Sequence, residues 1–281
     1  MLFRSYIPAP PLRDFITDFW LYDDYTPRHS SERILPSGTL ELVINLREDE
    51  LRIYHPERPC QRLSGALVSG AYNGFFGSDT AEEASIMGVH FKPGGAFPFL
   101  GAPAGELSGA HIDLETLWGR SAVALRERLC AAATPSERFR LLEAALLARL
   151  VRPPEHHYAV PAALEAFTQP EGLVSMREAA RRIGLSQRRF IQVFTAEVGM
   201  TPKAFCRVQR FHRALSLARG AAAPDWARLA VDCGYCDQPH LIRDFVAFSG
   251  FTPAEYFRHR SRLHAQGLHI KRYHLPLPLG G

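Results

Sequence analysis

Two short segments of the chain carry side chains that could hydrogen-bond to the edges of DNA bases. They span residues 187–192 and 238–243. On the faces that an amphipathic helix would leave outside the core, they hold Gln187, Arg188, Arg189, Ile191 and Gln192, and Gln238, His240, Ile242 and Arg243. Arg can pair with guanine and Gln with adenine through two hydrogen bonds each, and an aliphatic side chain can contact the thymine methyl group. These residue types predict a surface that reads the major groove; the alternative is a polar helix face exposed to solvent.

Both segments belong to one repeated unit. Residues 199–205 (GMTPKAF) recur as residues 250–256 (GFTPAEY), 51 positions later, with glycine, Thr, Pro and the final aromatic residue retained. Upstream, Gly184 recurs as Gly234 at an offset of 50. A period near 50 residues indicates that one supersecondary unit is present twice.

Each copy has the pattern of a helix, a tight turn and a second helix. In Met176–Ile183 the apolar residues Ala179, Ala180 and Ile183 lie on one helical face, and the segment that starts at Trp226 has the same spacing. A glycine suited to a left-handed turn follows each segment. Ser186 and Asp237 then stand where a second helix needs an N-cap. This is the helix-turn-helix pattern, in which the second helix presents its outer face to DNA.

A single long helix is predicted between the copies, over residues 203–219. A rigid connection would fix the distance between the two outer faces. If that distance is about one turn of DNA, roughly 34 Å, one chain could enter two successive major grooves.

Residues 161–260 resemble the C-terminal DNA-binding domain of the AraC family of bacterial transcription regulators. The segments that carry the resemblance are 175–205 (SMREAARRIGLSQRRFIQVFTAEVGMTPKAF) and 226–256 (WARLAVDCGYCDQPHLIRDFVAFSGFTPAEY). The resemblance implies two helix-turn-helix motifs on a helical scaffold, after an N-terminal domain for effector binding or dimerisation that is often a small β-barrel. The family's base-reading positions correspond to Arg188, Ile191 and Gln192, and to Gln238, His240, Ile242 and Arg243. Pro239, inside the second reading helix, departs from the family pattern.

The charge distribution favours an anionic partner for the C-terminal half. Residues 155–281 hold 17 Lys and Arg against 10 Asp and Glu, a net charge of +7. The first 154 residues hold 16 against 19, a net charge of −3. Such asymmetry is typical of a chain with one nucleic-acid-binding half, although an unevenly charged solvated surface gives the same count.

The pattern of apolar residues in the N-terminal half of the chain predicts short strands followed by helices. Apolar runs separated by Gly, Pro, Asn and Asp predict strands in a barrel or sandwich: Leu40–Leu46, Leu51–Tyr54, Ala66–Val68 and Ser85–Phe91. Before them, the spacing of Leu12, Phe15, Ile16 and Phe19 predicts a short helix. From Leu114 to Leu150 helical spacing returns, broken at Pro135, and we expect these helices to form an interdomain or dimer surface, or simply to pack on the domain.

The expected fold class is therefore α+β. It comprises a barrel-like or sandwich-like N-terminal sensor domain with trailing helices, and an all-α C-terminal domain with two helix-turn-helix motifs. The predicted division is an effector-sensing or dimerisation domain over residues 1–152 (β-rich to about 112), a linker over 153–160, a DNA-binding domain over 161–262 and a basic tail over 263–281.

Candidate effector-binding residues are His90, Lys92 and Glu41. His90 and Lys92 are two residues apart, so in a strand they would lie on the same face and could bind an anionic effector inside the barrel. The favoured alternative is that this face is solvated. Glu41, at the start of another predicted strand, could face the same interior.

No metal or cofactor is predicted. Cys233 and Cys236 form a C-x-x-C pair, and His240 follows four residues later. A zinc site needs a fourth ligand, which the sequence does not offer, so Cys233 is expected in the core. The histidines near the predicted linker and in the tail lack convergent spacing and are expected in solvent: His156, His157, His264, His269 and His274.

The composition excludes several classes of protein. With 46% hydrophobic and 22% charged residues the chain is neither disordered nor collagen-like, and no apolar run approaches the ~20 residues of a membrane helix. Five cysteines and no secretory signal favour the cytoplasm.

The predicted function is sequence-specific DNA binding for transcription regulation. The expected partners are double-stranded DNA, a small-molecule effector, a second copy of the chain and RNA polymerase. The alternatives are a non-specific architectural DNA-binding protein, and an enzyme acting on nucleic acid with a DNA-binding appendage. No nucleophile elbow, phosphate loop or paired carboxylate motif is present, so the chain is predicted not to be an enzyme.

Overall fold

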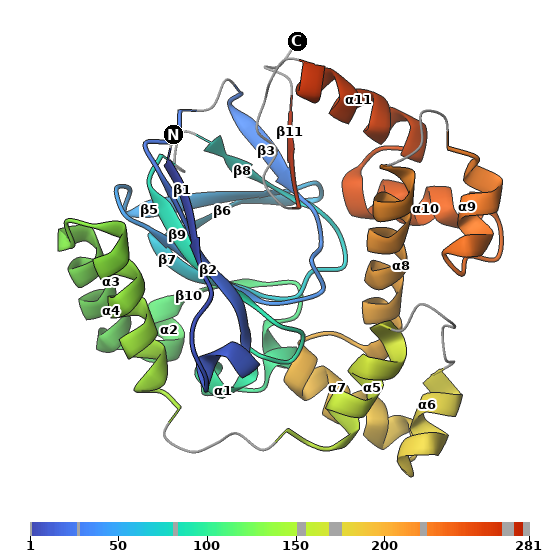
Figure 1. Cartoon of the computed structure of the whole chain (residues 1–281), viewed down its shortest axis with the longest axis horizontal. Helices are drawn as coiled ribbons and strands as arrows, with labels where there is room; N and C mark the ends of the chain where they lie inside the picture. Colours follow the sequence, from blue (N-terminus) through green and yellow to red (C-terminus); the bar gives the residue numbers. More distant parts are fainter. Residues whose placement is uncertain are drawn as a thin grey trace.

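Two antiparallel sheets form the N-terminal part of the protein (Figure 1). The computed structural model describes residues 2–26, 29–80, 84–150, 156–168, 176–219, 224–265 and 273–277. The first sheet has the order β1 (Leu2–Tyr6), β2 (Ile16–Asp23), β9 (Ile86–Phe91), β4 (Glu41–Asn45), β7 (Ala66–Ser69) and β10 (His111–Asp113). The second has the order β11 (His274–Pro276), β3 (Ser31–Ile34), β8 (Phe76–Asp79), β5 (Glu50–His55) and β6 (Arg58–Ser64).

The α+β class is confirmed, with open sheets rather than a closed barrel. The four predicted strands correspond to β4, β5, β7 and β9. The short helix predicted around Leu12–Phe19 is wrong beyond its first turn: a 3-10 turn, η1, covers Leu12–Asp14, and Ile16–Asp23 is strand β2. This segment is buried on both faces, so its apolar spacing has no clean period of two, and pairing with β1 and β9 overrides the helical pattern.

The first sheet separates two apolar layers, because alternate residues of a strand face opposite ways. On one face, Phe19, Leu42 and Val89 pack in the main core. On the other face, Trp20, Val43 and Leu67 pack towards the second sheet in a smaller cluster. The space between the sheets is therefore lined by apolar side chains from both.

The helices after the sheets pack on the outer face of the first sheet, α2 (Leu114–Trp118), α3 (Arg120–Ala131) and α4 (Pro135–Leu147). Leu125, Leu129 and Leu142 join the main core. Of the alternatives for these helices, packing on their own domain is confirmed, and an interdomain surface is wrong, since they lie on the side of the sheets away from the C-terminal helices (Figure 1); a dimer surface stays a prediction. Instead α1 (Phe97–Leu100) and the 3-10 turn η3 (Ala104–Leu107) contact the C-terminal part.

Seven helices are described in the C-terminal part of the chain: α5 (Ala159–Thr168), α6 (Met176–Ile183), α7 (Gln187–Val198), α8 (Pro202–Ala218), α9 (Trp226–Asp232), α10 (Gln238–Ser249) and α11 (Pro253–Ala265). Helices α6 and α7 form the first predicted motif and α9 and α10 the second, joined by α8. Residues 153–155 of the predicted linker lie outside the described residues, and its last two residues, 159 and 160, already belong to α5.

The end of the chain returns to the N-terminal sheets. Strand β11 pairs with β3, with His274 opposite Ile34 and Pro276 opposite Glu32. The expectation that His274 is solvated is wrong, because its Nδ1 lies 2.8 Å from Glu32 Oε1. His156 is also paired, with its Nδ1 2.8 Å from Glu197 Oε2. Pairing of β11 depends on backbone register and on a sheet edge distant in sequence, so histidine spacing could not indicate it. His269 lies outside the described residues.

Candidate nucleic-acid interface and internal cavity

The turns of the two motifs have the same geometry. Gly184 and Gly234 take φ values of +76° and +77°, the left-handed region that glycine enters without steric cost. The residue after each glycine donates its N–H to a carbonyl five residues back, Leu185 to Ala180 at 3.1 Å and Tyr235 to Ala230 at 2.9 Å. This closes both first helices in the same way and confirms the predicted turns.

We expect Gly234→Val to destabilise the second motif. A β-branched residue resists positive φ, and a non-glycine residue held there costs on the order of 1–3 kcal/mol. The melting curve and the hydrogen exchange of α9 and α10 measure the effect, with the exposed Val231→Ala as the control in the same motif. An unchanged melting curve would show that the turn does not depend on the glycine.

Both second helices begin at the predicted caps. Ser186 Oγ accepts a hydrogen bond from Arg189 N at 3.3 Å, and Asp237 Oδ1 accepts one from His240 N at 2.7 Å. Pro239 lies in the first turn of α10, where no backbone N–H is needed. The start of α10 is therefore regular despite the proline.

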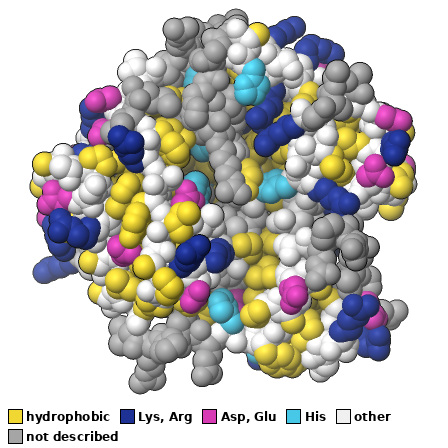
Figure 2. All heavy atoms as spheres, in the orientation of Figure 1, with side chains coloured by type: hydrophobic (Ala, Val, Ile, Leu, Met, Phe, Trp, Pro, Cys, Tyr) yellow, Lys and Arg dark blue, Asp and Glu magenta, His cyan; other side chains and the backbone are white. Residues whose placement is uncertain are grey.

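The predicted base-reading residues lie on the accessible faces of α7 and α10. Phe190 and Phe194 of α7, and Phe245 of α10, are fully buried on the opposite faces. Five of the predicted residues are exposed, Gln187, Arg188, Arg189, Gln192 and Arg243, and four are half-buried, Ile191, Gln238, His240 and Ile242. In the view of Figure 2, Lys and Arg side chains gather over α6 and α11, at the two ends of the helical part.

The side chains on these faces differ in how they are held. Arg189 Nη1 donates to Gln192 Oε1 at 3.0 Å, and the His240 ring packs edge-on to Tyr235 at 5.2 Å. Within the described part of the chain, Arg188 and Arg243 form no ion pair or hydrogen bond that would hold them away from a ligand. These two guanidinium groups are therefore available for bidentate contacts.

Helix α8 joins the two motifs through buried contacts with both. Phe205 packs against Phe194 of α7 at 5.8 Å between ring centroids, and Phe211 against Phe245 of α10 at 4.9 Å. Arg207 also binds the buried Asp244 of α10, with Nη2 at 2.6 Å and Nε at 3.1 Å from Oδ1. These contacts hold α7 and α10 on one scaffold.

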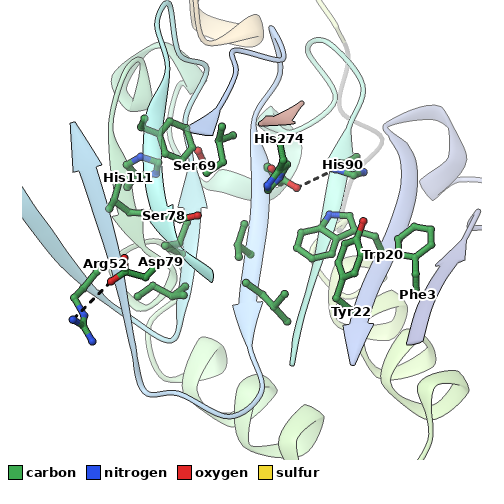
Figure 3. Close-up of a pocket in the computed structure, with 18 of the residues that line it drawn as sticks. Phe3, Trp20, Tyr22, Arg52, Ser69, Ser78, Asp79, His90, His111 and His274 are labelled. Carbon is green, nitrogen blue, oxygen red and sulfur yellow. Dashed lines mark ion pairs between the residues drawn. The ribbon is translucent and has the colours of Figure 1, made fainter. Parts of the chain in front are cut away.

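A cavity of about 300 Å³ lies between the two sheets (Figure 3). Volumes of this order and above are typical of small-molecule sites. Its lining is mostly apolar and includes the rings of Phe3, Trp20, Tyr22 and Phe76. The polar and charged residues that line it are Asp18, Glu41, Arg52, Ser69, Ser78, Asp79, His90, His111 and His274.

His90 lies between two carboxylates in this cavity. Its Nδ1 is 3.0 Å from Asp18 Oδ1 and its Nε2 is 3.1 Å from Glu41 Oε1. Burial alone would lower the pKa of His90, but the charge of Glu41 and the hydrogen bonds to both carboxylates raise that pKa from 6.5 to about 9. Burial opposes the charge of Glu41, yet His90 and His274 bring the pKa of Glu41 below its ordinary 4.5. The three groups therefore form a charged triad.

We expect the free energy of unfolding to fall by about 1–3 kcal/mol as the pH rises from 6.5 to 9. The pKa of His90 is higher in the folded than in the unfolded chain, so its contribution is complete below 6.5 and is lost through 9. Denaturant titrations across this range measure the slope. His90→Gln should abolish it, whereas the exposed His264→Gln should leave it unchanged. An equal slope in His90→Gln would assign the loss to another group.

Lys92 does not share the position of His90. Strand β9 ends at Phe91, and Lys92 is exposed and outside the cavity lining. Its backbone N–H donates to Phe15 O at 2.8 Å, and its carbonyl accepts from Gly95 N at 2.8 Å, which closes the turn after β9. Of the three candidate effector residues, the structure thus brings His90 and Glu41 together and leaves Lys92 apart.

His111 is a cavity residue that sequence reasoning missed. Its side chain is buried at 2% exposure, and neither ring nitrogen has a hydrogen-bond partner in the described structure. The ring packs against Tyr72 at 4.6 Å and Phe76 at 4.5 Å. Burial and, to a smaller extent, His55 lower the pKa of His111 to about 3, so the ring is neutral. Its strand has only three residues, too few for a pattern to mark the position.

The cysteine pair is divided between core and surface. Cys233 is fully buried, as expected, and Cys236 is exposed. Among the residues that the structure describes, no three His, Cys, Asp or Glu side chains are grouped to hold a metal ion. None of the described helices is both long and apolar enough to span a bilayer.

Comparison with known proteins places two family matches on the two parts of the chain. Residues 179–259 match a family described as "Helix-turn-helix domain", and residues 4–113 match one described as "Domain of unknown function (DUF6597)". No curated protein matches the chain.

The similar solved structures include ToxT from Vibrio cholerae, with a TM-score of 0.46 and 8% sequence identity over 92% of this chain and 98% of ToxT. ToxT bound to an unsaturated fatty acid has a TM-score of 0.44 and 8% identity over 85% of this chain and 95% of that one. ToxT bound to (E)-4-(8-methylnaphthalen-1-yl)but-3-enoic acid has a TM-score of 0.47 and 8% identity, over 85% and 98%.

Proposed function

We propose that this chain is a DNA-binding transcription regulator in which α7 and α10, both within the helix-turn-helix domain matched at residues 179–259, read two segments of major groove in one DNA site. We further propose that a small molecule in the cavity between the sheets controls this binding. The observation that carries the first proposal is the repeated geometry: two identical turns, two capped helices and two accessible faces on one scaffold.

Strands β3 and β11 support the second proposal, because they touch both the cavity and the DNA-binding helices. Ile34 and His274 line the cavity. The neighbouring Arg33 donates from Nη1 to Ser249 O, at the end of α10, at 2.9 Å, and packs over the Phe251 ring at 4.5 Å. On β11, Pro276 O lies 2.6 Å from His259 Nε2 of α11. A shift of this strand pair on ligand binding would therefore reach the second motif.

Selection of bound sequences from a random DNA pool by the full-length protein at physiological salt tests the first proposal. We expect a motif with two blocks whose centres are about one helical turn apart. Recovery of no motif, with binding that only fades as salt rises, would instead support the architectural alternative.

A variant that fills the cavity tests its control over DNA binding. Ser69 lines the cavity at 7% exposure, and Ser69→Phe should change operator affinity at least about threefold, roughly 0.7 kcal/mol. Ser108→Phe, at an exposed position outside the lining, is the matched control. Equal operator affinities in a folded Ser69→Phe protein would argue against control by the cavity.

Five further expectations stay predictions from the sequence. These are the domain boundaries at residues 152 and 161, a homodimer, contact with RNA polymerase, a cytoplasmic location and the absence of enzymatic activity.

A further inference from the structure

The charged groups that line the cavity carry an excess of negative charge. Three carboxylates face it, Asp18, Glu41 and Asp79, against the cations of His90 and Arg52. Behind His274 lies the buried Glu32, whose carboxylate is 2.8 Å from the His274 ring and 3.6 Å from His29 Nε2. Desolvated carboxylates in excess favour a cation as the occupant of such a space.

The cations of the lining are already bound to carboxylates. Both ring nitrogens of His90 are bonded, to Asp18 and to Glu41. Arg52 lies 3.8 Å from Asp79 through Nη1 and 3.5 Å from Glu50 through Nε. An anionic ligand would have to displace a carboxylate from one of these pairs, and its own charge would meet the remaining carboxylates. The lining therefore disfavours the binding of an anionic ligand.

Aromatic rings surround the carboxylate end of the cavity. The Trp20 ring lies 5.7 Å from the His90 ring and 5.9 Å from Tyr22, which in turn lies 4.8 Å from Phe3. Ring faces attract ammonium groups, so these rings favour a ligand cation at this end of the cavity. Figure 3 shows these aromatic residues with His90 on one side of the cavity.

His111 lies on the opposite side of the cavity in the same view. Its neutral ring presents one donor and one acceptor nitrogen, both buried and both without a partner in the described structure. Leaving such groups unpaired is costly, so a polar group of a ligand, such as a hydroxyl, would satisfy them.

We propose, on the premise of the cavity-controlled function above, that the effector is a small arylalkylamine with a hydroxyl group on the ring, at the end away from the amine. Its ammonium group lies against Asp18 and Glu41, beside the rings of Trp20 and Tyr22, its own ring extends across the apolar lining towards the opposite side, and its hydroxyl group meets His111. The charge and the two polar ends together distinguish this class from fatty acids and from purely apolar ligands.

Four probes of similar shape test this class by calorimetric titration of the full-length protein: phenethylamine, tyramine, phenethyl alcohol and phenylpropanoate. We expect phenethylamine to bind at least about tenfold more tightly than the alcohol or the acid, and tyramine about tenfold more tightly again. Glu41→Gln should weaken both amines about tenfold and leave the alcohol unchanged. His111→Phe should remove only the advantage of tyramine. The exposed Glu57→Gln, outside the lining, is the control for charge.

Two results would overturn the ligand class: equal or tighter binding of the acid or the alcohol, or no amine binding below millimolar concentration. The Ser69→Phe variant separates this failure from failure of the function itself. If the acid binds and alters operator affinity, the cavity controls DNA binding but the charge argument is wrong. If no probe binds and Ser69→Phe has the operator affinity of the wild type, both proposals fail.

Discussion

Replacement of Arg188 and Arg243 together by alanine is expected to remove most of the preference for the selected DNA sequence over random DNA. A bidentate contact to a base contributes about 1–3 kcal/mol of discrimination. The two residues lie on different helices, so their effects should add to about 2–6 kcal/mol, or roughly 30-fold to more than 10⁴-fold in specific affinity. Competition titrations with selected and random duplexes measure this ratio.

The single variants locate each contact. Arg188→Ala should relax specificity within the block read by α7, and Arg243→Ala within the block read by α10. Arg120→Ala with Arg128→Ala, two exposed arginines of α3 on the far side of the sheets, is the matched control for lost charge. Uniform weakening on every duplex, with a shallower salt dependence, would show that Arg188 and Arg243 contact phosphates instead.

Asp244→Ala is expected to lower the free energy of unfolding by about 3–5 kcal/mol. The Asp244 side chain is 3% exposed, and its Oδ1 accepts two hydrogen bonds from Arg207 of α8. Removing the carboxylate leaves a guanidinium group, itself 27% exposed, without its partner against the core of the second motif. Denaturant unfolding of the full-length protein measures the loss.

A surface pair and a compensated pair serve as controls. Asp232→Ala removes an exposed partner of Arg228, 3.8 Å away, and should change stability by less than about 1 kcal/mol. Arg207→Met with Asp244→Leu removes both charges at once and should recover most of the loss, because two apolar side chains replace a buried ion pair. A single Asp244→Ala variant as stable as wild type would show that the ion pair does not hold α10 to α8.

The DNA-binding part could be predicted from sequence because its signals are local. Gly184 and Gly234 mark their turns through backbone conformation, and Ser186 and Asp237 mark helix starts through hydrogen bonds three residues away. Each signal acts within one or two helical turns. Both copies of the repeated unit contain these turn and cap residues, so the helix bounds and the accessible faces could be predicted from the sequence alone.

The N-terminal part could be predicted only in class. Runs such as Leu40–Leu46 showed strands, but β2 has the spacing of a helix. Of the two edge strands of the second sheet, β6 is mostly polar and β11 has only three residues, and neither shows an apolar pattern. Their structure comes from backbone pairing with partners distant in sequence. Local propensity does not encode such pairing.

The sequence by itself thus determined the two motifs, their capped helices and the residues on their outer faces, because hydrogen bonds and apolar periodicity within a few residues specify them. Only the tertiary structure decided what faces the cavity. It placed His90 between Asp18 of β2 and Glu41 of β4, brought His274 from the end of the chain to β3, and left Lys92 outside. Those positions follow from strand register, and register is set by the burial of one whole face of a sheet rather than by any residue's neighbours in sequence.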